Sequence, residues 1–195
     1  MALFEPGRDA HAEIAVRVFG DPHGGHCPKG CQMRQDAKSR GHGWNYGMGP
    51  DRMIRDGVDP KVAYAFDNGM KQEFPVLCAK RDEWRAIAQN GGVLDNGFGR
   101  KMRADPRDAH TVAPALMGQG TAADIMKQWI LNCPRELDQY RMVTVHDEQV
   151  FQFPEADWQD MSRTVVQASE GDFMGVPILC DQSGPGRSWG EISAK

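Results

Sequence analysis

One stretch near the end of the chain, residues 141–153 (RMVTVHDEQVFQF), limits most strongly which fold the sequence can adopt. Apolar and β-branched residues alternate on both sides of His146-Asp147-Glu148, a pattern typical of two short strands joined by a turn. Adjacent side chains on a regular strand point to opposite faces. A tight turn can instead bring both carboxylates to one side, where they could hold a divalent metal ion. The alternative is that both acids are only solvated turn residues.

A second stretch, residues 34–47 (RQDAKSRGHGWNYG), carries groups suited to a nucleotide. Steps of four residues place Arg34, Lys38, His42 and Tyr46 along one stripe of a helix. Two cations one turn apart suit a triphosphate, whereas the alternative is a solvated basic helix face. The glycines of this stretch argue against that alternative, because each would cost about 1 kcal/mol in a helix built only for stability. We expect them to allow close approach of a base pair or another backbone.

The remaining sequence alternates between helical and strand patterns. Apolar spacing and end signals predict a helix within residues 1–20 capped by Asp9, helices across 51–91 with a break at Pro75, a hairpin turn at 95–97, a helix from Thr121 to Pro134, a helix at 155–169 and a strand at 176–180. Thr121 and Asp124 approximate a capping box, so Gln119 is expected in a glycine-flanked loop before that helix.

Composition narrows the class of protein. The 195 residues are 40% hydrophobic and 26% charged, which are globular values, and no run reaches the length of a membrane span. A net charge of −4 excludes a global positive field, so any nucleic-acid binding must use a local basic groove. Five cysteines, an odd number, without a signal peptide predict free thiols in a reducing compartment, and so a soluble cytoplasmic protein.

Residues 21–33 form a loop rich in glycine that holds four potential zinc ligands, His23, His26, Cys27 and Cys31. Thiolate and imidazole groups suit tetrahedral zinc. The spacing is poor, since His26 and Cys27 are adjacent and the usual pair of C-x2-C motifs is absent. A zinc site and a plain surface insertion therefore both stay open.

Three stretches, at residues 34–47, 118–124 and 145–148, resemble DNA polymerase family A and follow one another in the order of that family. Residues 34–47 resemble motif B, the fingers helix, and Val145-His146-Asp147-Glu148 resembles motif C, the palm hairpin that carries a metal-binding aspartate. Residues 118–124 (GQGTAAD) resemble the family segment whose glutamine reaches the minor groove of the primer–template. The resemblance covers nearly the whole chain apart from the loop at 21–33.

The resemblance implies an α+β fold, a partial polymerase right hand of the phage type, in which helical fingers accompany antiparallel palm strands with packed helices. Residues 1–92 would form the fingers-like region and residues 93–195 the palm-like region. Residues 4–11 (FEPGRDAH) resemble the segment after motif A, so motif A, the thumb and the exonuclease region are expected to be absent from this chain.

The resemblance also implies roles for single residues. Arg34 and Lys38 would contact the phosphates of the incoming dNTP, Tyr46 and Gly47 would border the nascent base pair, and His42 stands where the family usually has the Phe or Tyr that packs on the sugar. Primer–template DNA would be contacted through the residues Arg100, Arg103, Gln119 and His146.

Nucleotidyl transfer in this family uses two Mg²⁺ ions, about 3.5–4 Å apart. Asp147 would be the main ligand from this chain and Glu148 a weaker one, while the acid of motif A would come from a second polypeptide that also supplies the thumb. A phage-encoded enzyme of this kind would work in the cytoplasm of a bacterial host. Two alternatives stay open: an inactive truncated remnant, and a non-enzymatic module that binds zinc and nucleic acid.

Overall fold

The computed structural model describes residues 8–20, 27–28 and 30–193, which form helices and short antiparallel strand pairs. The chain divides into two compact units, unit 1 (Met1–Thr121) and unit 2 (Ala122–Lys195). The division between fingers and palm that we expect at residues 92 and 93 is a different boundary, and it stays a prediction.

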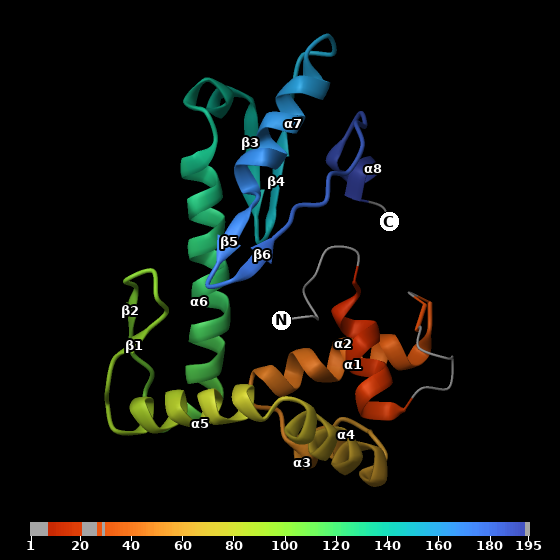
Figure 1. Ribbon diagram of the computed structural model, residues 1–195, viewed down its shortest axis with the longest axis vertical. Coiled ribbons are helices and arrows are strands. Elements are labelled where there is room, and N and C mark those ends of the chain that lie inside the picture. The colour runs from red at the N-terminus through yellow and green to blue at the C-terminus, as the bar shows by residue number, and fades with distance from the viewer. Residues whose placement is uncertain (1–7, 21–26, 29, 194–195) are drawn as a thin grey trace. The chain divides into compact units, whose positions relative to one another are not determined.

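Unit 1 begins with a set of helices, drawn from red to yellow-green in Figure 1. They are α1 (Ala10–Phe19), α2 (Gln32–Asn45), α3 (Pro50–Arg55), α4 (Pro60–Glu73) and α5 (Pro75–Gln89). Asp9 accepts hydrogen bonds from the first N–H groups of α1, and Asp59 does the same for α4. The helices α3, α4 and α5 start on proline. Proline has no backbone N–H, but the N–H groups of the first helical turn have no partner within the helix, so no hydrogen bond is lost. The predicted cap at Asp9 and the predicted break at Pro75 are confirmed.

Apolar clusters hold these helices together. Trp44, Met53, Phe66 and Met70 form one buried cluster that joins α2, α3 and α4. A second cluster joins α1 to α2 through small residues, of which Ala15 and Ala37 are fully buried. Helix axes approach more closely where the facing side chains are small. The two helices therefore pack side by side, so that polar residues on α1 and α2 can meet.

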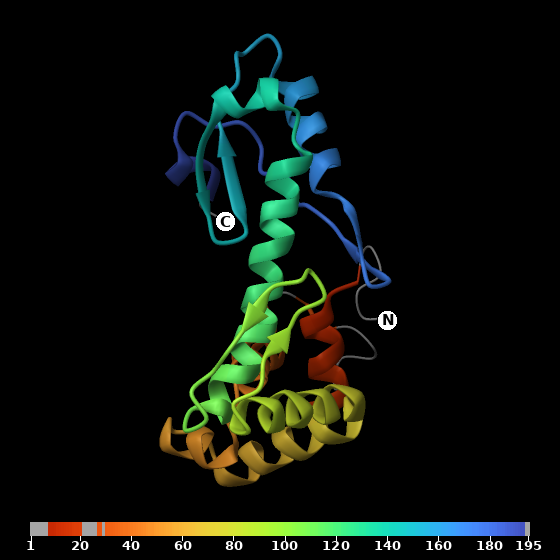
Figure 2. The same cartoon turned by 90° about the vertical axis from the view of Figure 1, so that its left-hand side faces the viewer.

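The hairpin predicted at residues 95–97 is present in unit 1. It pairs β1 (Leu94–Asp95) with β2 (Lys101–Met102), and its turn contains two glycines with positive φ, Gly97 and Gly99. Leu94 and Met102 pack against the first half of helix α6 (Ala109–Asn132), beside which the hairpin lies in Figure 2. The structure thus confirms this turn, and the face of the hairpin that packs on α6 is apolar.

The prediction of a loop before Thr121 is wrong. Residues 109–132 form one continuous helix, and Gln119 lies within it. Thr121 does not cap a helix, because its hydroxyl donates to the carbonyl oxygen of Met117 one turn earlier, at 2.6 Å. Apolar contacts of the buried side of α6 outweigh the roughly 1 kcal/mol that each glycine costs in a helix. Gly120 also gives room to Met102, since a Cβ there would lie 2.8 Å from its sulfur and the flexible methionine side chain would have to shift.

Unit 2 combines short strand pairs with helices around a small core. Its elements after α6 are the 3₁₀ helix η2 (Arg135–Tyr140), β3 (Arg141–Val145), β4 (Glu148–Phe151), α7 (Trp158–Ser169), β5 (Gly171–Phe173), β6 (Val176–Ile178) and α8 (Trp189–Ser193). Cys133, Leu137 and Val165 are buried at its centre, and Phe151 packs against them. The indole N–H of Trp129 donates to the carbonyl oxygen of Val165 at 2.9 Å, which fixes α7 against the second half of α6.

The strands of the described chain form separate two-stranded antiparallel pairs, β1 with β2, β3 with β4 and β5 with β6. The predicted strand at 176–180 is confirmed in part as β6, and its partner β5 was not predicted. Helices packed on antiparallel strand pairs make an α+β fold, as predicted. Within the described residues, no helix has both the length and the apolar character needed to cross a membrane.

Candidate functional site

The motif at residues 34–47 forms the face of α2 that the sequence predicts. Arg34, Lys38 and His42 lie at steps of four on this helix, and Tyr46 follows at its end. The rings of His42 and Tyr46 meet edge to face, with their centroids 4.8 Å apart. Lys38 and His42 are exposed, so this face is open to a ligand. We refer to these four residues as the cationic face of α2.

Arg34 is held in place by Asp9, the residue that caps α1. The Nε atom of Arg34 donates to a carboxylate oxygen of Asp9 at 2.7 Å, and the arginine side chain is only 12% exposed. Burial acts to raise the pKa of Asp9, but the hydrogen bonds from Arg34 and from the backbone of Ala12 outweigh it and the pKa is lowered. The sequence pattern gave no sign of this pair, which fixes the direction of the arginine.

His11 on α1 is a candidate functional residue that the sequence reasoning missed. Burial lowers its pKa first, and the charges of Arg34, Lys38 and His42 lower it further, while Asp9 acts in the opposite direction. These effects show that His11 shares the positive potential of the cationic face of α2. The only sequence signal was its place in the first turn of the helix that Asp9 caps.

Gly47 lies where the end of α2 packs against the start of α6. Its φ is 91°, and a Cβ there would lie 2.9 Å from the carbonyl oxygen of His110. The expectation that this glycine admits another backbone is therefore confirmed. The other two glycines of the motif differ: a Cβ on Gly43 would meet the side chain of Met48, and one on Gly41 meets nothing within 4 Å outside its own helix.

Two predicted site residues from distant parts of the sequence line one hollow. Tyr46 and Gln119 border a cavity of about 330 Å³ together with Ala115 and neighbouring residues of α6. That volume lies at the lower end of the range of small-molecule sites, which is about 300–1,000 Å³. Because Gln119 lies on a helix and not in a loop, its backbone position on α6 is fixed and its exposed side chain borders the same cavity as Tyr46. The structure thus brings motif B and the glutamine segment together.

The cations predicted to contact DNA lie at the β1–β2 hairpin. Arg103 is exposed just after β2. Arg100 lies against α6, since its Cδ atom is 3.6 Å from the point where a Cβ on Gly120 would stand. Lys101 is paired with Asp95 at 2.5 Å across the hairpin. The two arginines therefore stand at either end of β2, the strand whose Met102 packs on α6.

The acidic hairpin that the sequence predicts is present in unit 2, but its turn is one residue shorter than the predicted His146-Asp147-Glu148, because Glu148 already pairs within β4. Val145 pairs with Glu148, so His146 and Asp147 form a two-residue turn between β3 and β4. His146 has a φ of 53°, a left-handed conformation that suits the first position of such a turn but is uncommon outside glycine. Asp147 is exposed at the tip, and Glu148 is the first residue of β4.

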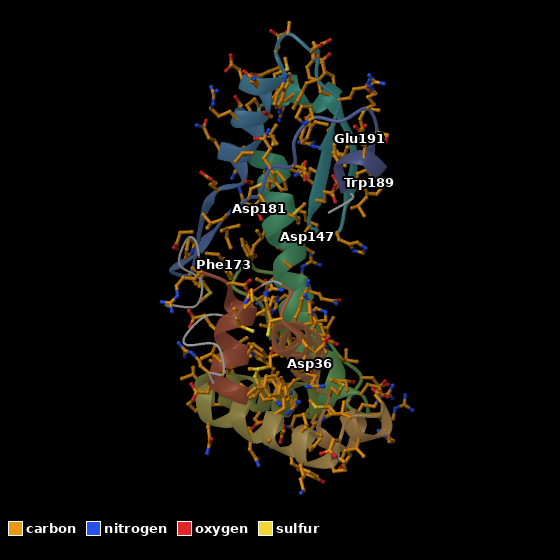
Figure 3. All side chains as sticks on the ribbon, turned by 90° about the vertical axis from the view of Figure 1, so that its right-hand side faces the viewer. Asp36, Asp147, Phe173, Asp181, Trp189 and Glu191 are labelled. Carbon is orange, nitrogen blue, oxygen red and sulfur yellow. The ribbon has the colours of Figure 1, made fainter. Side chains whose placement is uncertain are left out.

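Glu148 has a partner that the sequence reasoning did not find. The indole Nε1 of Trp189, on α8, donates to a carboxylate oxygen of Glu148 at 2.8 Å. Figure 3 labels Asp147 and Trp189 and shows α8 beside the β3–β4 hairpin. The two residues lie 41 positions apart in the sequence, so no local pattern indicates the contact. It fixes the direction of Glu148 next to the exposed carboxylate of Asp147.

The described residues fit only part of a metal site. Among them, no three His, Cys, Asp or Glu side chains gather closely enough to hold a metal ion. Asp147 and Glu148 offer two adjacent carboxylates of the hard-oxygen type that Mg²⁺ prefers, so ions held there would need further ligands from elsewhere. His23 and His26 lie outside the described residues, and the zinc hypothesis stays a prediction. Burial and a hydrogen bond with Cys31 raise the pKa of the Cys27 thiol.

Comparison with known proteins places these features in a family. The model of DNA polymerase family A matches residues 1–191. The thermostable DNA polymerase I of Thermus filiformis is 31% identical over 201 residues, which make up 96% of this chain and 24% of that protein. The DNA polymerase I of Streptococcus pneumoniae is 26% identical, over 96% of this chain and 23% of that protein. The chain thus spans about a quarter of the length of these curated relatives.

A solved structure shares the fold. The POL domain of Pol1 from M. smegmatis, determined in complex with DNA primer-template and dNTP, matches with a TM-score of 0.79 at 20% sequence identity. The match covers 91% of this chain and 34% of that chain. The fold of the chain is therefore that of a polymerase domain.

Proposed function

This chain belongs to DNA polymerase family A, and we propose that it supplies the nucleotide-binding helix and one metal-binding acid of an enzyme that carries out template-directed DNA synthesis. The observation that carries the proposal is the cationic face of α2, because it combines an exposed lysine with an arginine whose direction Asp9 fixes. The substrates would be dNTPs and a primer–template DNA, and the reaction would be nucleotidyl transfer.

The phosphates of a dNTP would bind between α1 and the cationic face of α2. Lys38 would act as a point charge, and Arg34 would present the N–H groups that Asp9 does not occupy. His11 lies in the same positive potential and would donate a hydrogen bond to the same phosphates. A positive site of this kind favours a triphosphate, which carries several negative charges.

The base pair would lie at the end of α2. Gly47 lets the end of α2 pack closely on the backbone of His110. This contact sets Tyr46 beside the cavity that it borders together with Gln119. An exposed glutamine amide can read the edge of a base pair, and the ring of Tyr46 can pack against it. Arg100 and Arg103 would contact the phosphates of the duplex, which gives affinity without sequence preference.

Asp147 would hold Mg²⁺ at the tip of the β3–β4 hairpin, and Glu148 would be the weaker ligand. Bound Mg²⁺ ions in such enzymes make the primer hydroxyl a better nucleophile and neutralise charge on the triphosphate. The residues of this chain position that chemistry: the two-residue turn presents Asp147 to solvent, and Trp189 restrains Glu148. A further acid, expected from motif A, would complete the ligand set.

Unit 2 has surfaces that suit a further segment carrying motif A. Met142 on β3 is 60% exposed and Leu131 on α6 is 77% exposed. Gln149 on β4 has a buried side-chain amide whose nitrogen and oxygen both lack partners within the described residues. Exposed large apolar groups and unpaired polar atoms are unfavourable unless they are covered. We propose that a segment bearing the motif A aspartate and the thumb covers them, as part of the same protein or of a second polypeptide.

The proposal is tested by measuring dNTP binding and DNA binding to the chain after Lys38→Ala. Loss of a contact with a charged phosphate group costs about 1.5–3 kcal/mol, which is a rise in the Kd for dNTP of roughly 10- to 150-fold. DNA binding should change by less than about threefold, because Lys38 would contribute only one screened charge to it. Lys61→Ala is the matched control, since Lys61 is an exposed lysine of α4.

Equal losses of dNTP and DNA affinity in the Lys38 variant would contradict the assignment of Lys38 to the triphosphate. An equal loss of dNTP affinity in the Lys61 variant would show that general charge, and not the cationic face of α2, governs nucleotide binding.

A further inference from the structure

A second cavity of unit 1 has no role in the proposed reaction. It measures about 180 Å³ and lies where α5 meets the end of α2 and the start of α6. Trp44, Lys71, Arg81, Arg85 and His110 are among the residues that line it. Because small-molecule sites usually measure about 300–1,000 Å³, this cavity suits a ligand smaller than a nucleotide. We call it the Arg81 cavity.

Arg81 is a buried cation that makes no ion pair within the described part of the chain. Arg81 is only 6% exposed, and its guanidinium carbon lies 3.7 Å from the centroid of the Trp44 ring. The Nε atom is buried and has no hydrogen-bond partner among the described residues. Stacking on an aromatic ring offsets part of the desolvation of a guanidinium, but it leaves the N–H donors unused. A buried donor of this kind calls for an acceptor.

Trp44 gives Arg81 a rigid platform. The indole N–H of Trp44 donates to the buried carboxylate of Asp67 at 2.9 Å, and Lys71 donates to the other oxygen of Asp67 at 2.6 Å. The carboxylate is thus already engaged on both oxygens, by groups other than Arg81. The guanidinium group is held over the ring, and Asp67 and Asp82 act on it only as nearby charges, without a direct hydrogen bond to it among the described residues.

The other groups around the cavity leave a positive potential. Arg85 donates to the carbonyl oxygen of His110 at 3.0 Å and to Asp82 at 3.2 Å, and Asp82 is largely exposed. Burial lowers the pKa of His110, and the charges of Arg85 and Arg81 lower it further. Three cationic side chains therefore face two acids, both of which already have partners.

We propose that the Arg81 cavity binds a tetrahedral phosphate-type oxyanion, with Arg81 as its main ligand and with Lys71 and His110 at its rim. The unused N–H groups of a fixed guanidinium match the oxygens of such an anion, and the cavity is large enough for one phosphate group but not for a nucleoside. The source is either free inorganic phosphate or a phosphodiester of single-stranded DNA. This site is separate from the cationic face of α2, and it does not rest on the proposed function.

The binding is measured by titrating inorganic phosphate into the chain at constant ionic strength and following the side-chain Nε–H resonance of Arg81 by NMR. A saturable shift of this resonance in the unaltered chain is expected, and this readout needs no variant. Phosphate binding to the variants is measured by isothermal titration calorimetry, because Arg81→Met lacks the Nε–H resonance. Arg81→Met keeps an apolar side chain over Trp44 and should bind phosphate at least about tenfold more weakly, because it loses the charge-assisted hydrogen bonds. Lys80→Met is the matched control, because it removes a neighbouring exposed cation of α5 that pairs with Glu83.

A short single-stranded oligodeoxynucleotide without terminal phosphates separates the two sources. A saturable Arg81 shift with the oligonucleotide, at concentrations below those needed for phosphate, assigns the site to phosphodiesters. A shift with phosphate alone assigns it to the free anion. No saturable shift with either probe, an equal shift with acetate, or equal weakening by Lys80→Met and Arg81→Met would overturn the proposal.

Discussion

Replacing Asp9 by alanine is the sharpest test of how the cationic face of α2 is organised. The Asp9 carboxylate does two things: one oxygen accepts from the backbone N–H groups of His11 and Ala12 at 3.0 and 3.1 Å, and the other accepts from Arg34 at 2.7 Å. The substitution therefore removes a helix cap and leaves a mostly buried guanidinium without its carboxylate.

The size of the effect follows from these two contacts. Loss of an N-cap costs about 1 kcal/mol. Arg34 and Asp9 are 12% and 29% exposed, so their pair is only partly screened, and its loss adds about 1–2 kcal/mol. We expect Asp9→Ala to lower the free energy of unfolding by about 2–3 kcal/mol in total.

Two further substitutions separate the contributions in urea unfolding. Asp59→Ala removes a cap of the same kind from α4, where the carboxylate accepts from the backbone N–H groups of Lys61 and Val62. No arginine of the described chain pairs with Asp59. It should cost about 1 kcal/mol. Asp9→Asn keeps a good cap residue and removes only the charge, so it should cost about 1–2 kcal/mol. Equal losses for Asp9→Ala and Asp59→Ala would refute a stabilising role for the Arg34 pair.

The same pair predicts a pH dependence. The pKa of Asp9 is lowered in the folded chain, below the value of about 3.9 for an unperturbed aspartate. A lowered folded-state pKa gives stability that is complete above the unfolded pKa and is lost as the pH falls through the folded pKa. The difference in unfolding free energy between the unaltered chain and Asp9→Asn should therefore be constant near neutral pH and shrink below about pH 4. A difference that grows in acid would contradict this sign.

Two other predictions concern single contacts. Gly47→Ala should destabilise unit 1 by about 2–3 kcal/mol, because alanine has both the unfavourable positive φ and a clash with the carbonyl oxygen of His110. Gly57→Ala, at a similar φ of 92° but in open space, should cost only about 1 kcal/mol in the same thermal unfolding assay, and equal costs would show that the clash does not matter. Trp189→Phe keeps an aromatic ring but removes the N–H donor to Glu148. NMR relaxation of a labelled Glu148 side chain should therefore report increased motion. Unchanged relaxation would mean that the hydrogen bond does not restrain Glu148.

Local structure was predictable where short-range chemistry decides it. The cap at Asp9, the break at Pro75 and the turn of the β3–β4 hairpin all follow from the residues at those positions. The start of α6 was not predictable in this way. Glycine and threonine at 118–121 signal a loop and a cap, but the apolar contacts of Met117 and Ala113 with the hairpin keep that segment helical.

The partners of the site residues were not predictable, because tertiary packing creates them. Arg34 meets Asp9 across 25 positions and Glu148 meets Trp189 across 41. The sequence predicts only that Arg81 lies on a helix. Its stacking on Trp44 depends on where α5 meets α2. Periodicity gives the face on which a residue lies, but not the residue that it contacts.

The central claim, that this chain contributes the acid of its hairpin to DNA synthesis, is tested most directly by primer extension in a chimera. The chain would replace the matching part of the Thermus filiformis relative, which supplies the regions that the chain does not cover. We expect template-dependent extension with Mg²⁺. Asp147→Asn should lower the extension rate at least about 10²-fold. Asp181→Asn, at an exposed aspartate of unit 2, is the control and should cause no comparable loss. Extension that is unchanged by Asp147→Asn would contradict the claim.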